Sequence, residues 1–200
     1  MRVQAPAFQI AVAGVILWAF SSAGPATALA AVPTQVSGAD VLTGRTIETR
    51  TTDSQKGTVV VFLSANCPCS ASHEIVLKTL FKEYSSQGFR FIGVHSNTDE
   101  SSTAEAIERT RSHFTESALP FPIIQDVSAK IANDWSALKT PHVFVVNPQG
   151  ELLYQGGVDD SHSSADAKKK YLKEALSAIQ SGKKPEVALT RSLGCAIKRN

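Results

Sequence analysis

The sequence lacks any block of basic residues, and its charges nearly cancel. Charged residues make up 19% of the 200 residues, and the formal net charge is +2. The short run Lys168-Lys169-Lys170 is typical of a solvated helix face. Because nucleic acids are bound by clustered positive charge, we expect no nucleic-acid partner. The 42% of hydrophobic residues is enough to form the core of one ordinary domain.

Long apolar runs are also absent. The longest, Phe8 to Phe20, has 13 residues, whereas a membrane-spanning helix needs about 20. Arg2 is the only charge in the first thirty residues, and Ala28-Leu29-Ala30 ends a stretch of small residues. This pattern is typical of a secretory signal peptide, residues 1–30. We therefore expect cleavage after Ala30, a mature protein that is periplasmic or otherwise secreted, and no stable membrane anchor.

Sulfur is scarce as well. Met1 is the only methionine, and there are three cysteines, Cys67, Cys69 and Cys195. All three cysteines follow the predicted signal peptide, so the exported protein would keep them. In an oxidising compartment an odd number leaves at least one cysteine unpaired, shared between molecules or reserved for reaction. Cysteine chemistry is therefore the first candidate function.

The chain does contain alternating patterns of buried strands and amphipathic helices. Thr58 to Ser64 is an unbroken β-branched and apolar run, typical of a strand buried on both faces of a parallel sheet. Leu77, Leu80, Phe81 and Tyr84 recur at the spacing of an amphipathic helix. The same criteria predict strands at 58–64, 89–95, 121–125, 142–146 and 152–154, and helices at 68–85, 101–116, 128–138 and 172–179.

The order of these elements predicts an α/β protein with a thioredoxin-like fold. A central mixed sheet is flanked by helices, with parallel strands first and a C-terminal hairpin plus helix last. Asn147-Pro148-Gln149-Gly150 is typical of the type I turn that would join the hairpin strands. The predicted organisation is an N-terminal extension over 31–57 with a short hairpin around Val41-Leu42 and Thr46 to Thr49, a thioredoxin-like domain over 58–182, and a tail over 183–200 that carries Cys195.

Cys67 stands where a buried strand leads into a helix. Proline suits the first helical position, so Pro68 places Cys67 at the N-cap and Cys69 in the first turn. Unpaired N–H groups and the helix dipole stabilise a thiolate there. We expect both thiols to be acidified, Cys67 more than Cys69. The alternative is that both are small, unreactive side chains packed beneath the helix.

Three segments resemble the redoxin family, the AhpC/TSA-related, thioredoxin-like group of proteins. They are Cys67-Pro68-Cys69-Ser70, Thr140-Pro141-His142, and the stretch from Tyr154 to Asp160. The resemblance implies a thioredoxin-like fold, a nucleophile at Cys67 and a cis-proline at Pro141 beside it. It also implies an enzyme that needs no cofactor and exchanges electrons with a protein or small-molecule thiol or disulfide partner.

The chain departs from two patterns found among such proteins. Ser70 stands where a Cys-x-x-Cys motif has its second cysteine, and Val60 stands where peroxiredoxins carry a proline. The activating arginine of peroxiredoxins is missing too, since Lys139-Thr140-Pro141 occupies that approach. The sequence therefore favours an exported thiol-disulfide oxidoreductase, and a thiol peroxidase with antioxidant activity is the alternative.

The thiol that would resolve a disulfide on Cys67 has two candidates. Cys69 is close in sequence, but the ring closed by a Cys-x-Cys disulfide is small and strained. Cys195 lies five residues from the end of the chain, on a tail that could fold back over the site. Sequence does not fix disulfide connectivity, so both remain open.

The histidines extend the set of candidate residues. On this fold His73, His95 and His142 fall near the end of the sheet that carries Cys67, where any of them could lower the pKa of its thiol. His113 and His162 are predicted to be surface residues. Soft thiolates at Cys67 and Cys69 with the imidazole of His142 could instead hold Cu(I), as in Sco-type copper assembly proteins. A third possibility is an interaction module that keeps only the fold.

Overall fold

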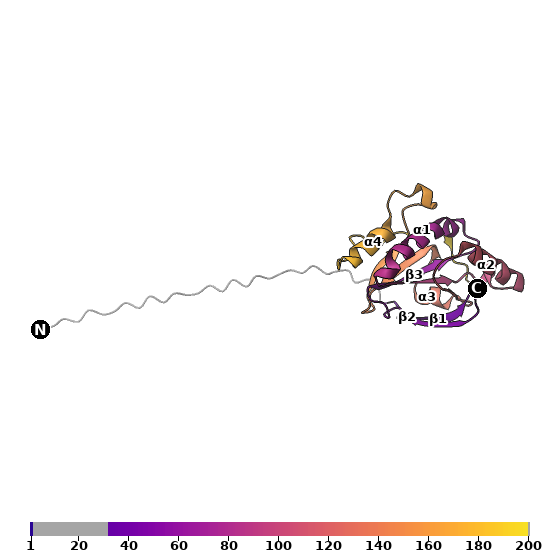
Figure 1. The fold of residues 1–200 in the computed structure, drawn as a ribbon, viewed down its shortest axis with the longest axis horizontal. Helices are drawn as coiled ribbons and strands as arrows, with labels where there is room; N and C mark the ends of the chain where they lie inside the picture. The colour runs from indigo at the N-terminus through magenta and orange to yellow at the C-terminus, as the bar shows by residue number, and fades with distance from the viewer. Residues whose placement is uncertain (2–31, 200) are drawn as a thin grey trace.

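The computed structural model describes residues 1 and 32–199 (Figure 1). Apart from Met1, the predicted signal peptide lies outside this described part, and so does the cleavage site after Ala30. No helix within residues 32–199 combines the length and the apolar character needed to cross a bilayer.

A mixed sheet of seven strands forms the centre of the molecule, in the order β2-β1-β5-β4-β3-β7-β8. Strands β3, β4 and β5 are parallel, whereas β7 and β8 form the antiparallel hairpin at one edge. The predicted order of parallel strands first and a hairpin last is confirmed. The strands are β1 (Gln35–Asp40), β2 (Thr46–Arg50), β3 (Gly57–Leu63), β4 (Phe89–His95), β5 (Ile123–Gln125), β6 (Lys139–Thr140), β7 (His142–Val146), β8 (Leu152–Gly156) and β9 (Cys195–Ala196).

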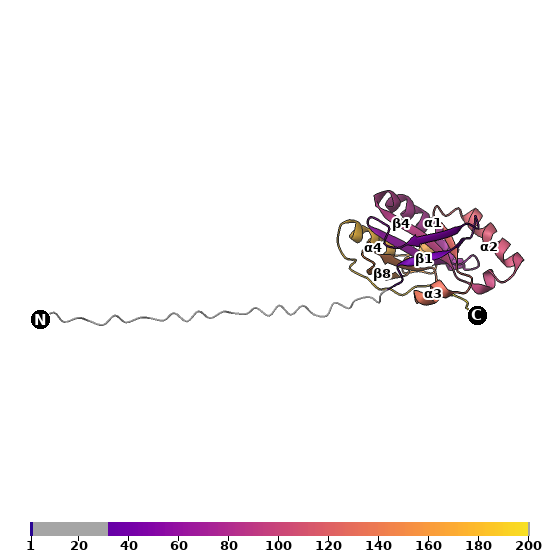
Figure 2. The ribbon, with the colours of Figure 1, turned by 90° about the horizontal axis from the view of Figure 1, so that it is seen from below.

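Helices cover both faces of this sheet (Figures 1 and 2). Strand β3 is buried along its whole length, because alternate side chains enter two different apolar clusters. Val59 and Val61 pack into the cluster beneath α1 and α4, and Val60 packs into the cluster that contains Ala132 of α3. The helices are α1 (Pro68–Tyr84), α2 (Ala104–Ser117), α3 (Lys130–Asp134) and α4 (Tyr171–Gln180), with short 3-10 turns η1 (Ser85–Gln87), η2 (Thr98–Glu100) and η3 (Ser164–Asp166).

Two predicted elements differ from the structure. The helix expected over 128–138 is limited to α3, because Ala129 and Ser136 on either side of it have the positive φ angles 53° and 52°. The first strand of the N-terminal hairpin ends at Asp40, before Val41 and Leu42. The carboxylate of Asp40 accepts hydrogen bonds at 2.8 Å from both the backbone N–H and the hydroxyl of Thr43, which starts the turn there.

Candidate functional site

Cys67 lies at the carboxyl end of β3, in the position that the sequence predicted. It is the N-cap residue of α1, with φ −96° and ψ 112°, and Pro68 is the first residue of the helix. The backbone N–H of Ala71 donates to the carbonyl of Cys67 at 3.0 Å, which closes the first turn. Cys67 thus stands at the N-terminus of α1, where the helix dipole stabilises an anion, and the backbone N–H of Ser70 in the first turn helps to lower the pKa of its thiol.

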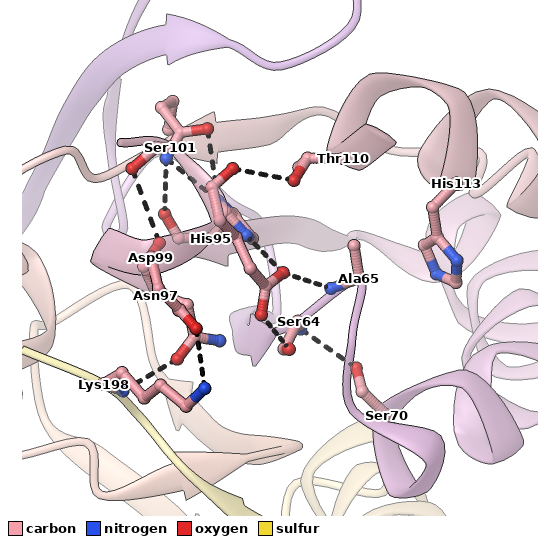
Figure 3. A network of polar contacts seen from close by, with 12 residues as sticks. Ser64, Ala65, Ser70, His95, Asn97, Asp99, Ser101, Thr110, His113 and Lys198 are labelled. Atoms are coloured by element: carbon pink, nitrogen blue, oxygen red, sulfur yellow. Dashed lines mark hydrogen bonds and ion pairs between the residues drawn. The ribbon is translucent and has the colours of Figure 1, made fainter. Parts of the chain in front are cut away.

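Ser70 has a structural role of its own. It is fully buried, and its hydroxyl accepts a hydrogen bond from the backbone N–H of Ser64 at 3.2 Å (Figure 3). The contact joins the last residues before Cys67 to the first turn of α1. A residue with a hydroxyl thus occupies the second cysteine position of a Cys-x-x-Cys motif and satisfies a buried donor.

The buried carboxylate of Glu100 holds the same loop through a second set of hydrogen bonds. Glu100 accepts hydrogen bonds from the Ser64 hydroxyl at 2.5 Å and from the Ala65 N–H at 2.8 Å. The Nε2 atom of His95 lies 2.9 Å from the same carboxylate. These bonds lower the pKa of Glu100 although its burial acts to raise it. The carboxylate therefore fixes the two residues nearest the end of β3 before Cys67.

The Thr140–Pro141 peptide bond is cis, the conformation that the resemblance implied. It connects β6 to β7 and places the Thr140 carbonyl 3.1 Å from the thiol of Cys67, which donates to it. The hydroxyl of Thr140 is buried and has no hydrogen-bond partner within the described residues. The segment around Pro141 thus forms one wall of the site.

The C-terminal tail forms a second wall. Its strand β9 pairs with β6, with Cys195 opposite Thr140 and Ala196 opposite Lys139. Gly194 makes this approach possible, since a Cβ atom there would lie 2.0 Å from the Thr140 carbonyl oxygen. Ile197 is buried in the apolar cluster on the α3 side of the sheet and donates its N–H to the Leu138 carbonyl at 3.0 Å.

Polar contacts fasten the tail beyond Ile197. The backbone N–H of Lys198 donates to the side chain of Asn97 at 2.8 Å, and its ammonium group lies 2.6 Å from Asp99 (Figure 3). The guanidinium of Arg199 donates to the carbonyl of Ala137. Asn97 and Asp99 belong to the short segment that ends in Glu100. The same segment therefore contacts both the tail and the loop before Cys67.

These elements bring all three cysteines together. The sulfur atoms of Cys67, Cys69 and Cys195 all lie within 4.8 Å of one another, and all three are free thiols. Cys67 is 1% exposed, Cys69 is half-buried and Cys195 is exposed. Cys67 is therefore the inaccessible member of the group, and Cys195 is its most exposed residue.

The pKa values of the three thiols diverge. Burial acts to raise the pKa of Cys67, but the pKa is lowered overall by the polar groups beside the thiol: the Cys195 thiol, the Thr140 hydroxyl and the backbone N–H groups of Ser70 and Cys195. Burial and the neighbouring Cys67 raise the pKa of Cys69. The same two causes raise the pKa of Cys195 to about 12. The expectation that Cys69 is acidified was wrong, because its burial disfavours a thiolate and a thiolate on Cys67 repels a second negative charge.

The predicted histidines all make hydrogen bonds to groups other than the Cys67 thiol. His73 lies 2.6 Å from the Cys69 carbonyl and 3.0 Å from Asp159, and His95 bonds to Glu100. His142 accepts from the backbone N–H of Leu138 through Nδ1. The third donor grouped with Cys67 and Cys69 is Cys195, where the sequence suggested His142.

Sequence reasoning missed Glu100 and His162. His162, predicted only as a surface residue, is exposed, with Nδ1 3.5 Å from the sulfur of Cys69. It is 93 residues away in the chain, and no spacing pattern links the two. Glu100 lies between β4 and α2, and the one available signal is an acidic residue following the end of a buried strand.

Comparison with known proteins agrees with the fold. A family model described as Redoxin matches residues 21–171. No curated protein matches the chain. An uncharacterized conserved protein from Geobacillus kaustophilus has a similar structure, with 24% identity, a TM-score of 0.76, and coverage of 86% of this chain and 92% of that one.

Two further solved structures are similar. A hypothetical protein from Sinorhizobium meliloti has 23% identity and a TM-score of 0.75, over 87% of this chain and 97% of that one. The C-terminal domain of a putative thiol-disulfide oxidoreductase from Bacteroides thetaiotaomicron has 16% identity and a TM-score of 0.57, over 76% of this chain and 95% of that one. At these identities the likeness establishes the fold alone.

Proposed function

Because this chain belongs to the Redoxin family, we propose that it is an exported thiol-disulfide oxidoreductase in which Cys67 is the nucleophile and Cys195 the resolving thiol. One observation carries the proposal. Two sulfurs with opposite pKa shifts, the pKa of Cys67 lowered and that of Cys195 raised to about 12, lie side by side at a helix N-terminus.

The proposed reaction has two exchange steps. The Cys67 thiolate attacks one sulfur of a partner disulfide, forms a mixed disulfide and expels the other sulfur as a thiolate. Cys195 then loses its proton and attacks the Cys67 sulfur, which forms the Cys67–Cys195 disulfide and releases the second partner thiol. The partner disulfide gains two electrons, and the two protein thiols lose them. With an oxidised protein and a dithiol partner the same steps run in reverse.

Cys195 suits the resolving step better than Cys69. A disulfide between Cys67 and Cys69 would close a strained Cys-x-Cys ring, whereas Cys195 approaches from a separate strand. In the reduced site, the sulfur of Cys195 lies within 4.8 Å of that of Cys67, and the thiol and backbone N–H of Cys195 help to lower the pKa of Cys67. In the mixed disulfide the sulfur of Cys67 carries no negative charge. The repulsion that helps to raise the pKa of Cys195 is then absent, so Cys195 loses its proton more easily before it attacks.

Access to Cys67 requires movement of the tail. Cys67 is 1% exposed, and the β6–β9 pairing that covers it involves only two residues on each strand. A partner protein or small molecule therefore reaches the nucleophile by displacing residues 194–196, and the return of this segment brings Cys195 to the mixed disulfide.

Trapping experiments test the assignment of the two thiols. With a model disulfide, Cys67→Ser should lose all exchange, and Cys195→Ser should accumulate a mixed disulfide on Cys67. Cys69→Ser should turn over as wild type does. A mixed disulfide that accumulates in Cys69→Ser and not in Cys195→Ser would reassign the resolving thiol. Rapid consumption of hydrogen peroxide with sulfenic acid on Cys67 and slow disulfide exchange would instead support the thiol peroxidase.

Export is the remaining part of the proposal. The short apolar run followed by Ala28-Leu29-Ala30 supports a cleaved signal peptide. N-terminal sequencing of the exported protein should begin at Ala31. A retained leader with the protein bound to the membrane would contradict export in soluble form.

A further inference from the structure

Three sulfur atoms from three different positions converge at one point. Cys67 is the N-cap of α1, Cys69 lies in its first turn, and Cys195 is on β9. The three sulfurs lie within 4.8 Å of one another. They are reduced and unpaired, and the cluster is buried on the side of Cys67 and open on the side of Cys195.

This spacing suits a three-coordinate metal ion. With metal–sulfur bonds of about 2.3 Å, a planar ion holds three sulfurs about 4.0 Å apart. The observed limit of 4.8 Å means that each sulfur pair needs to close by less than about 1 Å. Rotation of the side chains of Cys69 and Cys195 supplies such a shift, because neither of them is fully buried.

We propose that the reduced protein binds one Cu(I) ion through the thiolates of Cys67, Cys69 and Cys195. Thiolates are soft ligands that favour Cu(I), Zn²⁺ and iron–sulfur clusters over harder metal ions, and of these Cu(I) suits a site with three ligands. The ion enters from the exposed face at Cys195, three Cu–S bonds form, and the thiol protons that remain on the cluster are released to solvent. No change of oxidation state is required when copper is supplied as Cu(I).

The third ligand distinguishes this site from the one suggested by sequence. The Nδ1 atom of His142 accepts the backbone N–H of Leu138 at 3.2 Å, whereas Cys195 is already grouped with the other two sulfurs. Zn²⁺ prefers four ligands, and the cluster supplies three. The imidazole of His162 lies near Cys69, but it is exposed, and within residues 32–199 no second hydrogen bond holds it toward the centre.

The tail determines whether the site is complete. Cys195 reaches the cluster because Gly194 permits the close approach to Thr140 and because Ile197 is buried. Metal binding by three reduced thiols does not require that Cys67 exchange disulfides. The two activities exclude each other in time, since a Cys67–Cys195 disulfide removes two of the three ligands.

Copper titration of the full chain tests the proposal. The protein is kept reduced with a phosphine and titrated with Cu(I) against a chromophoric Cu(I) chelator. We expect one Cu(I) per chain and three sulfur neighbours by X-ray absorption. Cys195→Ser should leave two sulfur neighbours and weaken Cu(I) binding by at least roughly tenfold. Proton release measured in weak buffer should fall in the same variant.

Ala196→Ser is the matched control, because it introduces the same side chain at the neighbouring exposed position of the tail. It should bind Cu(I) as wild type does. Wild type with two sulfur neighbours, Cys195→Ser with unchanged affinity, or tighter binding of Zn²⁺ than of Cu(I) would each overturn the proposal. Disulfide exchange assayed on metal-free samples of the same proteins separates this result from the fate of the proposed oxidoreductase activity.

Discussion

At the level of single residues, the Cys67 thiol is governed by two opposed effects. Burial disfavours its thiolate, yet hydrogen bonds from a thiol, a hydroxyl and two backbone amides lower its pKa. Hydrogen bonds to an anion are stronger than bonds between neutral groups, so a few donors suffice to reverse the effect of burial.

The contribution of Cys195 to this balance can be isolated. Replacing Cys195 by alanine removes the thiol donor, so we expect the pKa of Cys67 to rise. The rate of iodoacetamide modification at Cys67, followed by mass spectrometry against pH, measures the shift. Ala196→Ser, which keeps the donor, should give the wild-type profile. An unchanged or lower midpoint in Cys195→Ala would show that the tail thiol does not hold the thiolate.

At the level of elements, the sequence predicted the strand and helix around Cys67 well and the tail poorly. Strand β3 carries a seven-residue buried pattern, and α1 carries an apolar repeat with proline at its start, so both have strong local signals. Strand β9 has two exposed residues and therefore no periodicity. Its pairing depends on Gly194 and on Ile197, whose partners lie more than fifty residues earlier in the chain.

The short helix α3 is a case in which a clear local pattern predicted too long an element. The pattern over 128–138 predicted a helix, but Ser136 adopts a left-handed φ of 52°. Trp135 is 2% exposed, and its ring packs edge-on against Phe144 of the sheet. Packing of a large aromatic side chain onto the sheet overrides helical propensity at the end of the element.

The buried carboxylate of Glu100 links three elements, and its removal should be costly. In Glu100→Gln, one face of the side chain becomes an amide N–H₂ group, so at least one of the donors from Ser64, Ala65 and His95 loses its acceptor. We expect a loss of about 3 kcal/mol in the free energy of unfolding, measured by urea denaturation. Hydrogen exchange at the Ala65 amide should accelerate by at least roughly tenfold.

Glu105→Gln is the control for this change, since Glu105 is an exposed carboxylate on α2. It should leave the urea midpoint close to that of the wild type. If Glu100→Gln proved as mild as Glu105→Gln, the carboxylate would not be what fixes the loop before Cys67.

At the level of the whole molecule, the two parts of the functional site come from segments far apart in the sequence. The nucleophile follows β3, while the covering segment is β9, close to the C-terminus. Residues 97–100 contact both parts: Asn97 accepts a hydrogen bond from Lys198 of the tail, and Glu100 accepts one from Ala65 before Cys67. Opening the tail therefore breaks contacts to the segment that also supports the loop before Cys67, so the position of the tail and the position of that loop depend on each other.

The pH dependence of folding should reveal the buried histidine beside the cis-proline. Burial lowers the pKa of His142 from 6.5 to about 4. Between pH 6.5 and pH 4 His142 is protonated in the unfolded chain and neutral in the folded chain. The free energy of unfolding therefore falls as the pH is lowered from 6.5 toward 4. Between pH 6.5 and 5 this loss amounts to about 1.5 kcal/mol. The pKa of Glu100 is lowered below 4.5, so its contribution is lost only at lower pH.

His142→Asn separates this effect from other titrating groups, because the amide oxygen can still accept the Leu138 N–H and asparagine does not titrate. The free energy of unfolding, measured by urea denaturation, should differ between pH 6.5 and pH 5 by about 1.5 kcal/mol less in the variant than in the wild type. Wild type and variant share the carboxylate-paired His73, His95 and His113, so these cancel in the difference. Equal pH dependence in the two proteins would mean that His142 takes up its proton in the folded state as readily as in the unfolded chain.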